Sequence, residues 1–103
     1  MNYKLKVSPH TERQIENALL YVSNTLSNPS AAAFILADIE DAYDILESAP
    51  ESFPLCDDPY LKLQNYRKFT LRHHSYLFIY RIQDSTVYLA GFFHMLENYA
   101  EKL

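Results

Sequence analysis

The sequence predicts an α+β domain in which helices pack on an antiparallel sheet. Apolar residues recur every three or four positions between residues 9 and 48, as in amphipathic helices, and the period changes to two between residues 66 and 94, as in strands. The chain has 103 residues, which is enough for one domain. We therefore expect a single domain over residues 1–103, with the order β-α-α-β-β-β-α and an N-terminal helical hairpin packed on one face of the sheet.

The first strand and the first helix are predicted from local signals. Residues 3–7 alternate and form a short strand, and Ser8-Pro9 then supplies an N-cap and a proline suited to the first helical turn. The apolar residues of this helix stand at helical intervals, at Ile15, Leu19, Val22 and Leu26. Asn28-Pro29 ends the helix, because proline disfavours a helical residue before it.

A second helix is expected from about Ser30 to Ser48. Its apolar seam is narrow and consists of Leu36, Ile39, Tyr43 and Leu46. Its other face is acidic and consists of Asp38, Glu40, Asp41, Asp44 and Glu47. The two helices are joined by a few residues, so they should form an antiparallel hairpin that covers one face of the sheet.

The C-terminal half is predicted to hold the rest of the sheet. Residues 49–62 contain three prolines and favour an irregular surface loop. Strands are expected at 66–72, 76–82 and 86–94, with the middle one apolar on both faces, and residues 95–103 favour a short final helix. The only glycine, Gly91, lies inside the last of these strands. A glycine-rich phosphate-binding loop is therefore excluded.

The composition indicates the cellular compartment of the protein and the distribution of its charge. The single cysteine, Cys56, excludes an internal disulfide framework, and the N-terminus lacks the apolar run of a signal peptide. No stretch approaches the roughly 18 apolar residues that cross a membrane. We expect a cytoplasmic protein. The net charge of −4 hides an asymmetry, because residues 1–59 contain ten acidic and three basic residues whereas residues 60–103 contain three acidic and six basic ones.

The basic half carries side chains suited to RNA cleavage by the 2′-hydroxyl, which needs a base, stabilisation of the phosphorane and an acid for the leaving oxygen. The residues of this basic window are Lys62, Arg67, Lys68, Arg72, His73, His74 and Arg81. His94 is a candidate acid, because an unperturbed histidine titrates near pH 6.5. Arg67, Lys68 and Arg72 are candidates to stabilise the phosphorane, and His73 or His74 is a candidate base.

Each candidate also has a structural explanation. His94 is also suited to end a strand and hydrogen-bond locally, and Lys68 with Arg72 is also suited to form a solvated sheet edge. Arg67 and Arg81 are equally suited to bind the carboxylates of a partner. A zinc site built from the histidines is disfavoured, since no cysteine or carboxylate shares their spacing. We expect no metal and no cofactor.

The sequence resembles RelE/ParE toxins of bacterial type II toxin–antitoxin systems over nearly its full length. The matching pieces run in family order: the strand and Ser-Pro helix start at 7–9, the helix junction with Asn28-Pro29 and Ala31-Ala32-Ala33, the proline-containing stretch 50–59, Asn65-Tyr66-Arg67-Lys68, Ile79-Tyr80-Arg81, and a last strand ending in His94 before Tyr99. The resemblance implies a small antitoxin partner that wraps the toxin. It also implies one of two targets, since RelE-like members cleave mRNA on the ribosome and ParE-like members inhibit DNA gyrase without cleaving RNA.

Carried over residue by residue, Arg67 and Lys68 match the family's basic pair, His94 its terminal histidine and Tyr99 the aromatic residue beyond it. Leu77 departs from the pattern, because many RNA-cleaving members have an arginine in this strand. We expect a ribosome-dependent mRNA endoribonuclease, with gyrase inhibition and an inert antitoxin-binding co-repressor as alternatives. The expected assembly is a homodimer or a toxin–antitoxin hetero-oligomer. The expected catalytic residues are His94, Arg67, Arg72 and Tyr99, and the expected substrate-binding residues are Lys62, Lys68, His73, His74 and Arg81.

Overall fold

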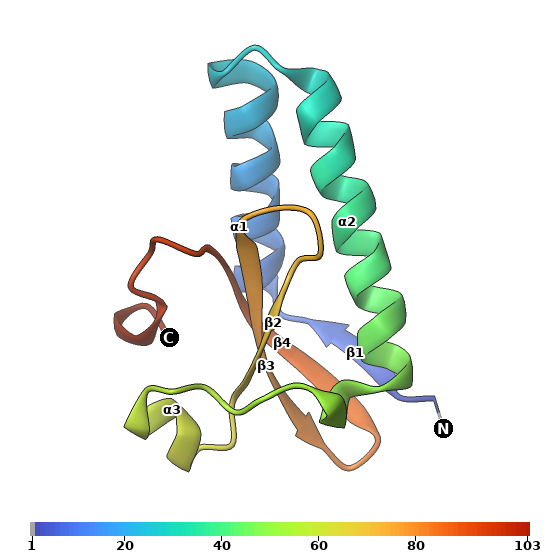
Figure 1. Ribbon diagram of the computed structural model, residues 1–103, viewed down its shortest axis with the longest axis vertical. Helices are drawn as coiled ribbons and strands as arrows, with labels where there is room; N and C mark the ends of the chain where they lie inside the picture. Colours follow the sequence, from blue (N-terminus) through green and yellow to red (C-terminus); the bar gives the residue numbers. More distant parts are fainter. Residues whose placement is uncertain (1) are drawn as a thin grey trace.

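The computed structural model describes residues 2–103 and shows a helical hairpin standing on a four-stranded sheet (Figure 1). The elements are β1 (Lys4–Val7), α1 (Pro9–Leu20), a π-helical turn η1 (Tyr21–Thr25), α2 (Pro29–Ser48), a 3-10 turn η2 (Pro50–Ser52), α3 (Pro59–Leu63), β2 (Arg67–Thr70), β3 (Tyr76–Gln83), β4 (Thr86–His94) and a 3-10 turn η3 (Tyr99–Glu101). None of the helices described in residues 2–103 is long and apolar enough to cross a membrane. The predicted α+β class with a helical hairpin on one face of the sheet is confirmed.

The sheet is mixed, so the prediction of a purely antiparallel sheet is wrong at one edge. Its strand order is β1-β4-β3-β2, in which β2, β3 and β4 pair antiparallel and β1 pairs parallel to β4. Only three residues separate each pair of strands expected at 66–72, 76–82 and 86–94, as in antiparallel hairpins, and β2, β3 and β4 do pair antiparallel. No turn joins β1 to β4, and period-two alternation is the same in parallel and antiparallel strands, so the local pattern could not give this orientation.

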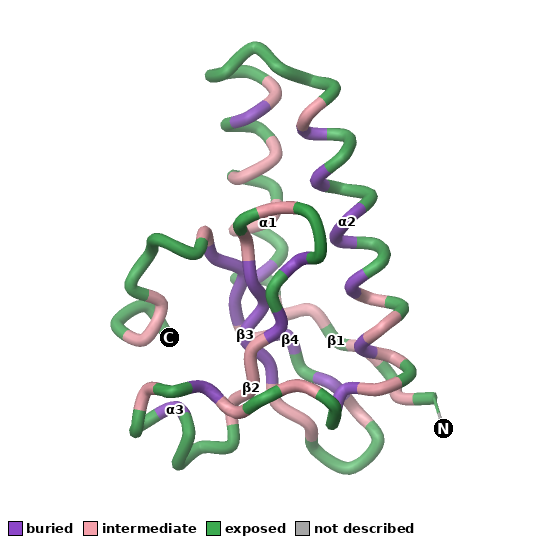
Figure 2. The backbone as a smooth tube through the Cα atoms, in the orientation of Figure 1, coloured by how far each residue is buried: buried purple, intermediate pink, exposed green. Residues whose placement is uncertain are grey.

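The start of α1 is attached to the sheet by its cap. The Ser8 side chain accepts a hydrogen bond from the Thr11 backbone N–H at 3.0 Å, as predicted for an N-cap. The buried Thr11 hydroxyl donates to the Leu89 carbonyl oxygen at 2.9 Å. Asn28 caps α2 in the same way, by accepting from the Ala31 N–H at 3.1 Å. These caps orient the hairpin, whose tip extends beyond the sheet and is exposed (Figure 2).

The buried face of α2 differs from the predicted seam. Its buried residues are Ala32, Ile35, Asp38, Ile39, Ala42 and Leu46. Leu36, placed in the seam, is 44% exposed, and Asp38, placed on the acidic face, is 3% exposed. The error came from starting the helical repeat at Leu36, which rotates the predicted inward face away from Ile35. Weighting the small residues Ala32 and Ala42 would have given the correct face.

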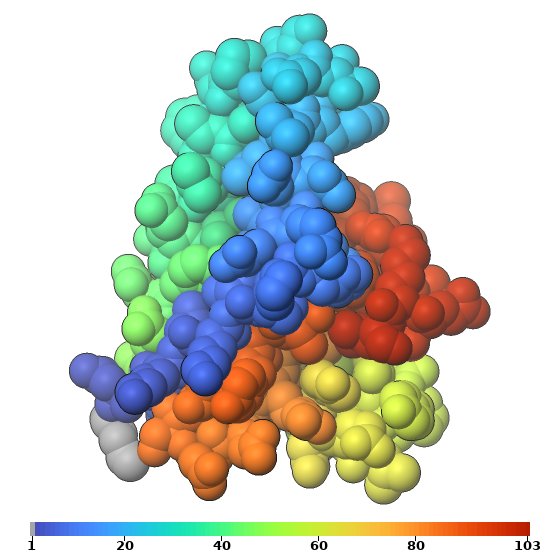
Figure 3. Space-filling view, turned by 180° about the vertical axis from the view of Figure 1, so that it is seen from behind, coloured from blue at the N-terminus to red at the C-terminus, as the bar shows by residue number. Residues whose placement is uncertain are grey.

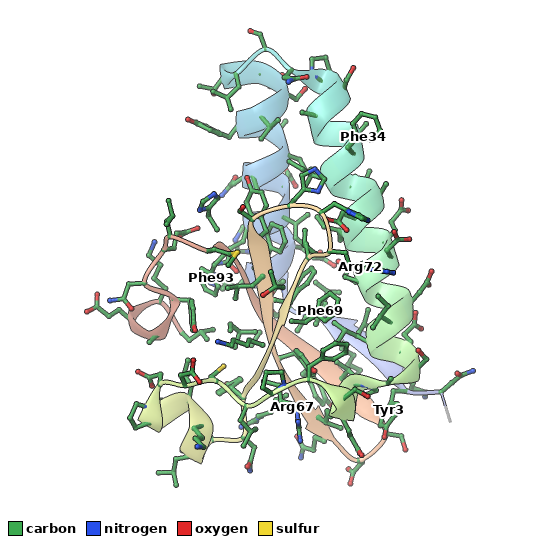
Figure 4. The ribbon with its side chains drawn as sticks, in the orientation of Figure 1. Tyr3, Phe34, Arg67, Phe69, Arg72 and Phe93 are labelled. Carbon is green, nitrogen blue, oxygen red and sulfur yellow. The ribbon has the colours of Figure 1, made fainter. Side chains whose placement is uncertain are left out.

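The sheet carries a core on each face. The larger core packs Phe69, Phe78, Tyr80, Val87, Leu89 and Phe92 against the two long helices. The smaller core gathers Cys56, Leu61, Leu77, Ile79 and Phe93 beneath α3 and the C-terminal segment, with Tyr66, Tyr99 and Ala100 at its edge. Figure 4 shows the two sides, with Phe69 toward α2 and Phe93 toward the C-terminal segment. Burial on both faces confirms the prediction that the middle strand is central.

The bounds of several elements differ from the sequence prediction. The first helix, expected to continue through Leu26, is α-helical only to Leu20 and is followed by the π-helical turn η1. The region 49–62 contains η2 and the short helix α3, which Asp58 caps through the Leu61 N–H at 3.0 Å. The strand expected at 66–72 is limited to Arg67–Thr70. The final helix expected over 95–103 is only the 3-10 turn Tyr99–Glu101. After β4, the Met95 N–H donates to the Ser75 carbonyl oxygen, a long-range bond that competes with a local helix.

Gly91 provides a test of this packing. The strand register shifts between Ile79 and Tyr80, opposite the segment that contains Gly91. A Cβ at Gly91 would overlap the ring of Phe93, whose Cζ would be only 2.8 Å away, and Phe93 is 1% exposed and cannot move aside. We expect Gly91→Ala to destabilise the protein by about 1–3 kcal/mol through overpacking. Urea unfolding measures this, with Ala90→Ser as the neighbouring control, and a Gly91→Ala variant as stable as the wild type would contradict the packing.

Candidate functional site

His94 lies in a half-open cavity of about 400 Å³ between α1 and the end of the sheet. The cavity is lined by Gln14, Asn17, Ala18, Tyr21, Tyr76, Phe92, His94 and Glu97. Its aromatic wall is ordered, because the rings of Tyr76 and Phe92 stack with centroids 5.1 Å apart. The His94 ring stands edge-on to Tyr76 at 5.3 Å. The cavity therefore combines an apolar wall with amide, phenol and imidazole groups.

Local hydrogen bonds fix the orientation of His94. Its Nδ1 accepts from the Leu96 backbone N–H at 3.2 Å, and its own backbone N–H donates to Glu97 Oε1 at 2.9 Å. The proton of the neutral ring is then on Nε2. Protonation of Nδ1 would break the bond to Leu96. Among residues 2–103 no group hydrogen-bonds to Nε2, so this atom is the one that can act on a bound molecule.

Glu97 belongs to the same corner of the molecule. Its Oε2 accepts from Lys102 Nζ at 2.7 Å. The hydrogen bond from Lys102 outweighs the opposing effect of burial and holds the pKa of Glu97 below its ordinary value, helped by the backbone N–H of His94. The carboxylate is therefore ionised at neutral pH and serves to hold the segment after β4.

Tyr99, expected to act beside His94, lies on the other side of the sheet. It packs on Phe93 with ring centroids 6.1 Å apart, at the edge of the smaller core. His94 and Phe93 are consecutive in β4, so their side chains point to opposite faces. The structure does not bring Tyr99 and His94 together.

Arg67 and Lys68 also lie on opposite faces. The Arg67 guanidinium donates to the Phe53 carbonyl oxygen at 2.6 Å and reaches the Glu51 carbonyl oxygen at 3.5 Å. Lys68 turns to the other face and pairs with the exposed Asp57 at 3.1 Å, a hydrogen bond that raises the pKa of Lys68. Arg67 thus holds the proline-containing stretch onto β2, which is a structural use of its N–H groups.

The turn between β2 and β3 holds the remaining basic candidates. Arg72 and His73 are exposed there and His74 is half-buried. Figure 4 shows Arg72 beside α2 and Arg67 at the far end of β2, with Phe69 between them. The two arginines are therefore not placed to hold one phosphate.

Asp38, which the sequence analysis missed as an inward residue, anchors this turn. One carboxylate oxygen, Oδ2, accepts from the His73 backbone N–H at 2.9 Å and contacts His74 Nδ1 at 2.8 Å. Burial by itself raises the pKa of Asp38, but the hydrogen bonds from His74 and His73 outweigh it and hold the pKa below the ordinary value. Within residues 2–103 the other oxygen, Oδ1, is buried without a hydrogen-bond partner.

Leu77, Lys62 and Arg81 complete the predicted set. Leu77 is 4% exposed in the smaller core, so an arginine at this position would bury a charge. Lys62 is exposed in the last turn of α3, and Arg81 lies over the ring of Tyr66 with its Cζ 5.3 Å from the centroid. Within residues 2–103 no three potential metal ligands form a cluster.

Comparison with known proteins decides the family. The family model described as the ParE toxin of the type II toxin–antitoxin system parDE matches residues 5–99. The chain belongs to this family. It is therefore the toxin of a type II toxin–antitoxin system, as the resemblance to RelE/ParE toxins predicted.

Solved structures agree with this fold. A chain of the chromosomal ParDE toxin–antitoxin system from P. aeruginosa superimposes with a TM-score of 0.72 at 14% sequence identity, covering 89% of this chain and 95% of that chain. A chain of the toxin–antitoxin complex RelBE2 from Mycobacterium tuberculosis gives a TM-score of 0.59 at 20% identity, covering 91% and 99%. No curated protein sequence matches the ParE toxin chain significantly.

The contribution of Asp38 can be measured through pH. Because the folded-state pKa of Asp38 is lowered from 3.8, its stabilising effect should be present above that value and lost as pH falls through the lower folded pKa. We expect Asp38→Asn to cost about 1–3 kcal/mol at pH 7 and less at pH 3, by urea unfolding. Asp41→Asn, on the exposed face of the same helix, should cost little at either pH. A difference between wild type and Asp38→Asn that does not change with pH would contradict the assignment.

Proposed function

We propose that this ParE-family toxin arrests growth by binding and inhibiting DNA gyrase, and that it cleaves no RNA. The observation that supports this most is the separation of the residues an RNA-cleaving site would need. His94 lies in the cavity beside α1, Tyr99 on the opposite face, and Arg67 is bound to the carbonyl oxygens of residues 51 and 53. A phosphorane needs several donors within hydrogen-bond reach of one position, and these side chains do not converge on one.

The burial of Leu77 supports the same proposal. In this strand many RNA-cleaving relatives carry an arginine, whereas here Leu77 packs with Ile79 and Phe93 in the smaller core. An inhibitor that acts by binding needs a complementary surface but no proton donor and no phosphorane site. The matched family is that of ParE toxins, and the resemblance to ParE-like members implied inhibition of gyrase, which is consistent with the proposal. A cognate antitoxin would neutralise the toxin, and both structural relatives come from toxin–antitoxin systems.

Ribosome-dependent mRNA cleavage is the second candidate, and the position of His94 favours it. Nε2 of His94 makes no hydrogen bond within residues 2–103, and His94 lines a cavity that also holds Gln14 and Asn17. A general acid at this place would need a phosphate held by other cations. Arg72 and His73 in the β2–β3 turn are the exposed basic residues that could supply that contact.

The two functions give different outcomes for one substitution. His94→Gln keeps the size and hydrogen bonding of the side chain but removes the proton donor. Under gyrase inhibition we expect full growth arrest from His94→Gln, whereas a general acid would lose about 10²–10⁴-fold in rate. Three assays distinguish the functions: growth after induction, supercoiling by gyrase in the presence of purified toxin, and primer extension on cellular mRNA.

His10→Gln on the surface of α1 is the matched control for these measurements. We expect inhibited supercoiling, intact mRNA and relief of the arrest by co-expression of the antitoxin. If the wild type and His10→Gln cut mRNA at specific codons and His94→Gln does not, the proposal of gyrase inhibition is wrong and the toxin is an endoribonuclease. Unimpaired growth with soluble wild-type protein would leave only the inert co-repressor.

A further inference from the structure

Four residues form a row across the sheet, on the face away from the two long helices. The strand register places Lys6 beside Tyr88 and Tyr88 beside Arg81. Arg67 pairs with Tyr80, and Tyr66, the residue before β2, lies against Arg81. The cation–aromatic row, as we call Lys6, Tyr88, Arg81 and Tyr66, therefore alternates charged and aromatic side chains across β1, β4, β3 and the residue before β2.

Contacts within the row hold its cations over aromatic rings. The Lys6 ammonium lies 5.8 Å from the centroid of the Tyr88 ring, and the Arg81 guanidinium lies 5.3 Å from that of Tyr66. Such contacts attract a cation without neutralising it. In the part of the chain that the structure describes, the side-chain ion pairs involve Lys68, His74 and Lys102, and neither Lys6 nor Arg81 has a carboxylate partner.

The next row toward the β3–β4 turn extends this surface with polar groups. Lys4 pairs with Thr86, and Thr86 pairs with Gln83. A hollow of about 250 Å³ beside them is lined by Gln64, Asn65, Arg81, Ile82 and Gln83. Three of these side chains are amides, which both donate and accept hydrogen bonds, and one is a guanidinium, which only donates. Figure 3 shows β1, the β3–β4 hairpin and the segment before β2 side by side at this end, in blue, orange and yellow.

We propose that the cation–aromatic row, with Lys4, binds single-stranded nucleic acid through its phosphate backbone. Unpaired cations supply the phosphate contacts that dominate such binding, and the neighbouring amides suit sugar and base edges. The exposed ring of Tyr88 offers a π surface to unstacked bases, which a duplex keeps stacked. With strands about 4.8 Å apart, the row spans roughly 15 Å, so it is long enough to contact several consecutive nucleotides.

This surface is distinct from the His94 cavity and goes beyond the proposed inhibition of gyrase. His94 is on the α1 side of the sheet, whereas the cation–aromatic row is on the other face and at the opposite end of β4. The net charge of −4 conceals the row, because the acidic residues are concentrated on the helical hairpin. Electrostatic attraction acts locally, since salt screens charges beyond about 10 Å at 0.1 M ionic strength.

Fluorescence anisotropy with the purified full-length toxin tests the proposal. The probes are a labelled 20-nucleotide oligothymidine strand and a mixed-sequence duplex of equal length, each titrated between 50 and 200 mM NaCl. Three cations contacting phosphates predict a log–log salt slope of about −2 for the single strand, from about 0.7 per phosphate. We expect the Lys6→Gln/Arg81→Gln double variant to lose roughly tenfold or more in affinity and to show a slope nearer −0.7.

Three further variants make the result specific. Arg13→Gln removes one exposed charge on α1, outside the row, and should bind like the wild type, whereas the single variant Lys6→Gln should bind more weakly. Lys6→Arg/Arg81→Lys keeps the charges and should retain most of the binding, while thermal unfolding reports whether each variant folds. The proposal is overturned by wild-type protein that shows no salt-dependent binding, by equal losses in Arg13→Gln and Lys6→Gln, or by tighter binding of the duplex.

Discussion

The structure depends on a central strand that is buried on both faces. Leu77, Phe78, Ile79 and Tyr80 of β3 are each no more than 4% exposed, so apolar surface must cover both sides of this strand. The helical hairpin covers one side, and α3 with the C-terminal segment covers the other. Tyr80 shows how closely the cover is attached, because its hydroxyl donates to the Pro50 carbonyl oxygen at 2.6 Å. Burial raises the pKa of Tyr80, so this hydroxyl stays protonated and the bond persists.

This constraint decides where polar chemistry can occur. The middle of the sheet is apolar on the face away from the helical hairpin. Burial raises the pKa of Cys56 on this face to about 11, which leaves its thiol unreactive. The charged and polar side chains of the candidate surfaces lie at the two ends of the strands. At one end His94 shares a cavity with α1, and at the other Lys6 and Arg81 lie over tyrosine rings. The polar groups therefore form two separate surfaces, which supports the proposal of a toxin that acts by binding.

The buried carboxylate of Asp38 is the exception in the larger core. A charge with one oxygen unpartnered costs free energy, and a well-packed apolar residue would often be as stable. Its effect is to fix one conformation of the turn after β2, by binding the backbone of His73 and the ring of His74. Arg72 and His73 lie after the end of β2 at Thr70, so Asp38 rather than strand pairing fixes their backbone. The geometry indicates that Asp38 serves to select one conformation of this turn.

The sequence by itself determined the α+β class, the helical hairpin with its Ser8 and Asn28 caps, the antiparallel meander and the toxin family. These follow from interactions within a few residues, namely capping, turn formation and hydrophobic period, together with an ordered set of motifs. The tertiary structure alone decided the parallel pairing of β1, the burial of Asp38 and the grouping of the candidate residues. Arg67 and Lys68 are neighbours in sequence yet lie on opposite faces, whereas Lys6 and Arg81 share one face across β4. The reason is physical: strand alternation separates adjacent side chains, and only long-range pairing selects which distant strands lie side by side.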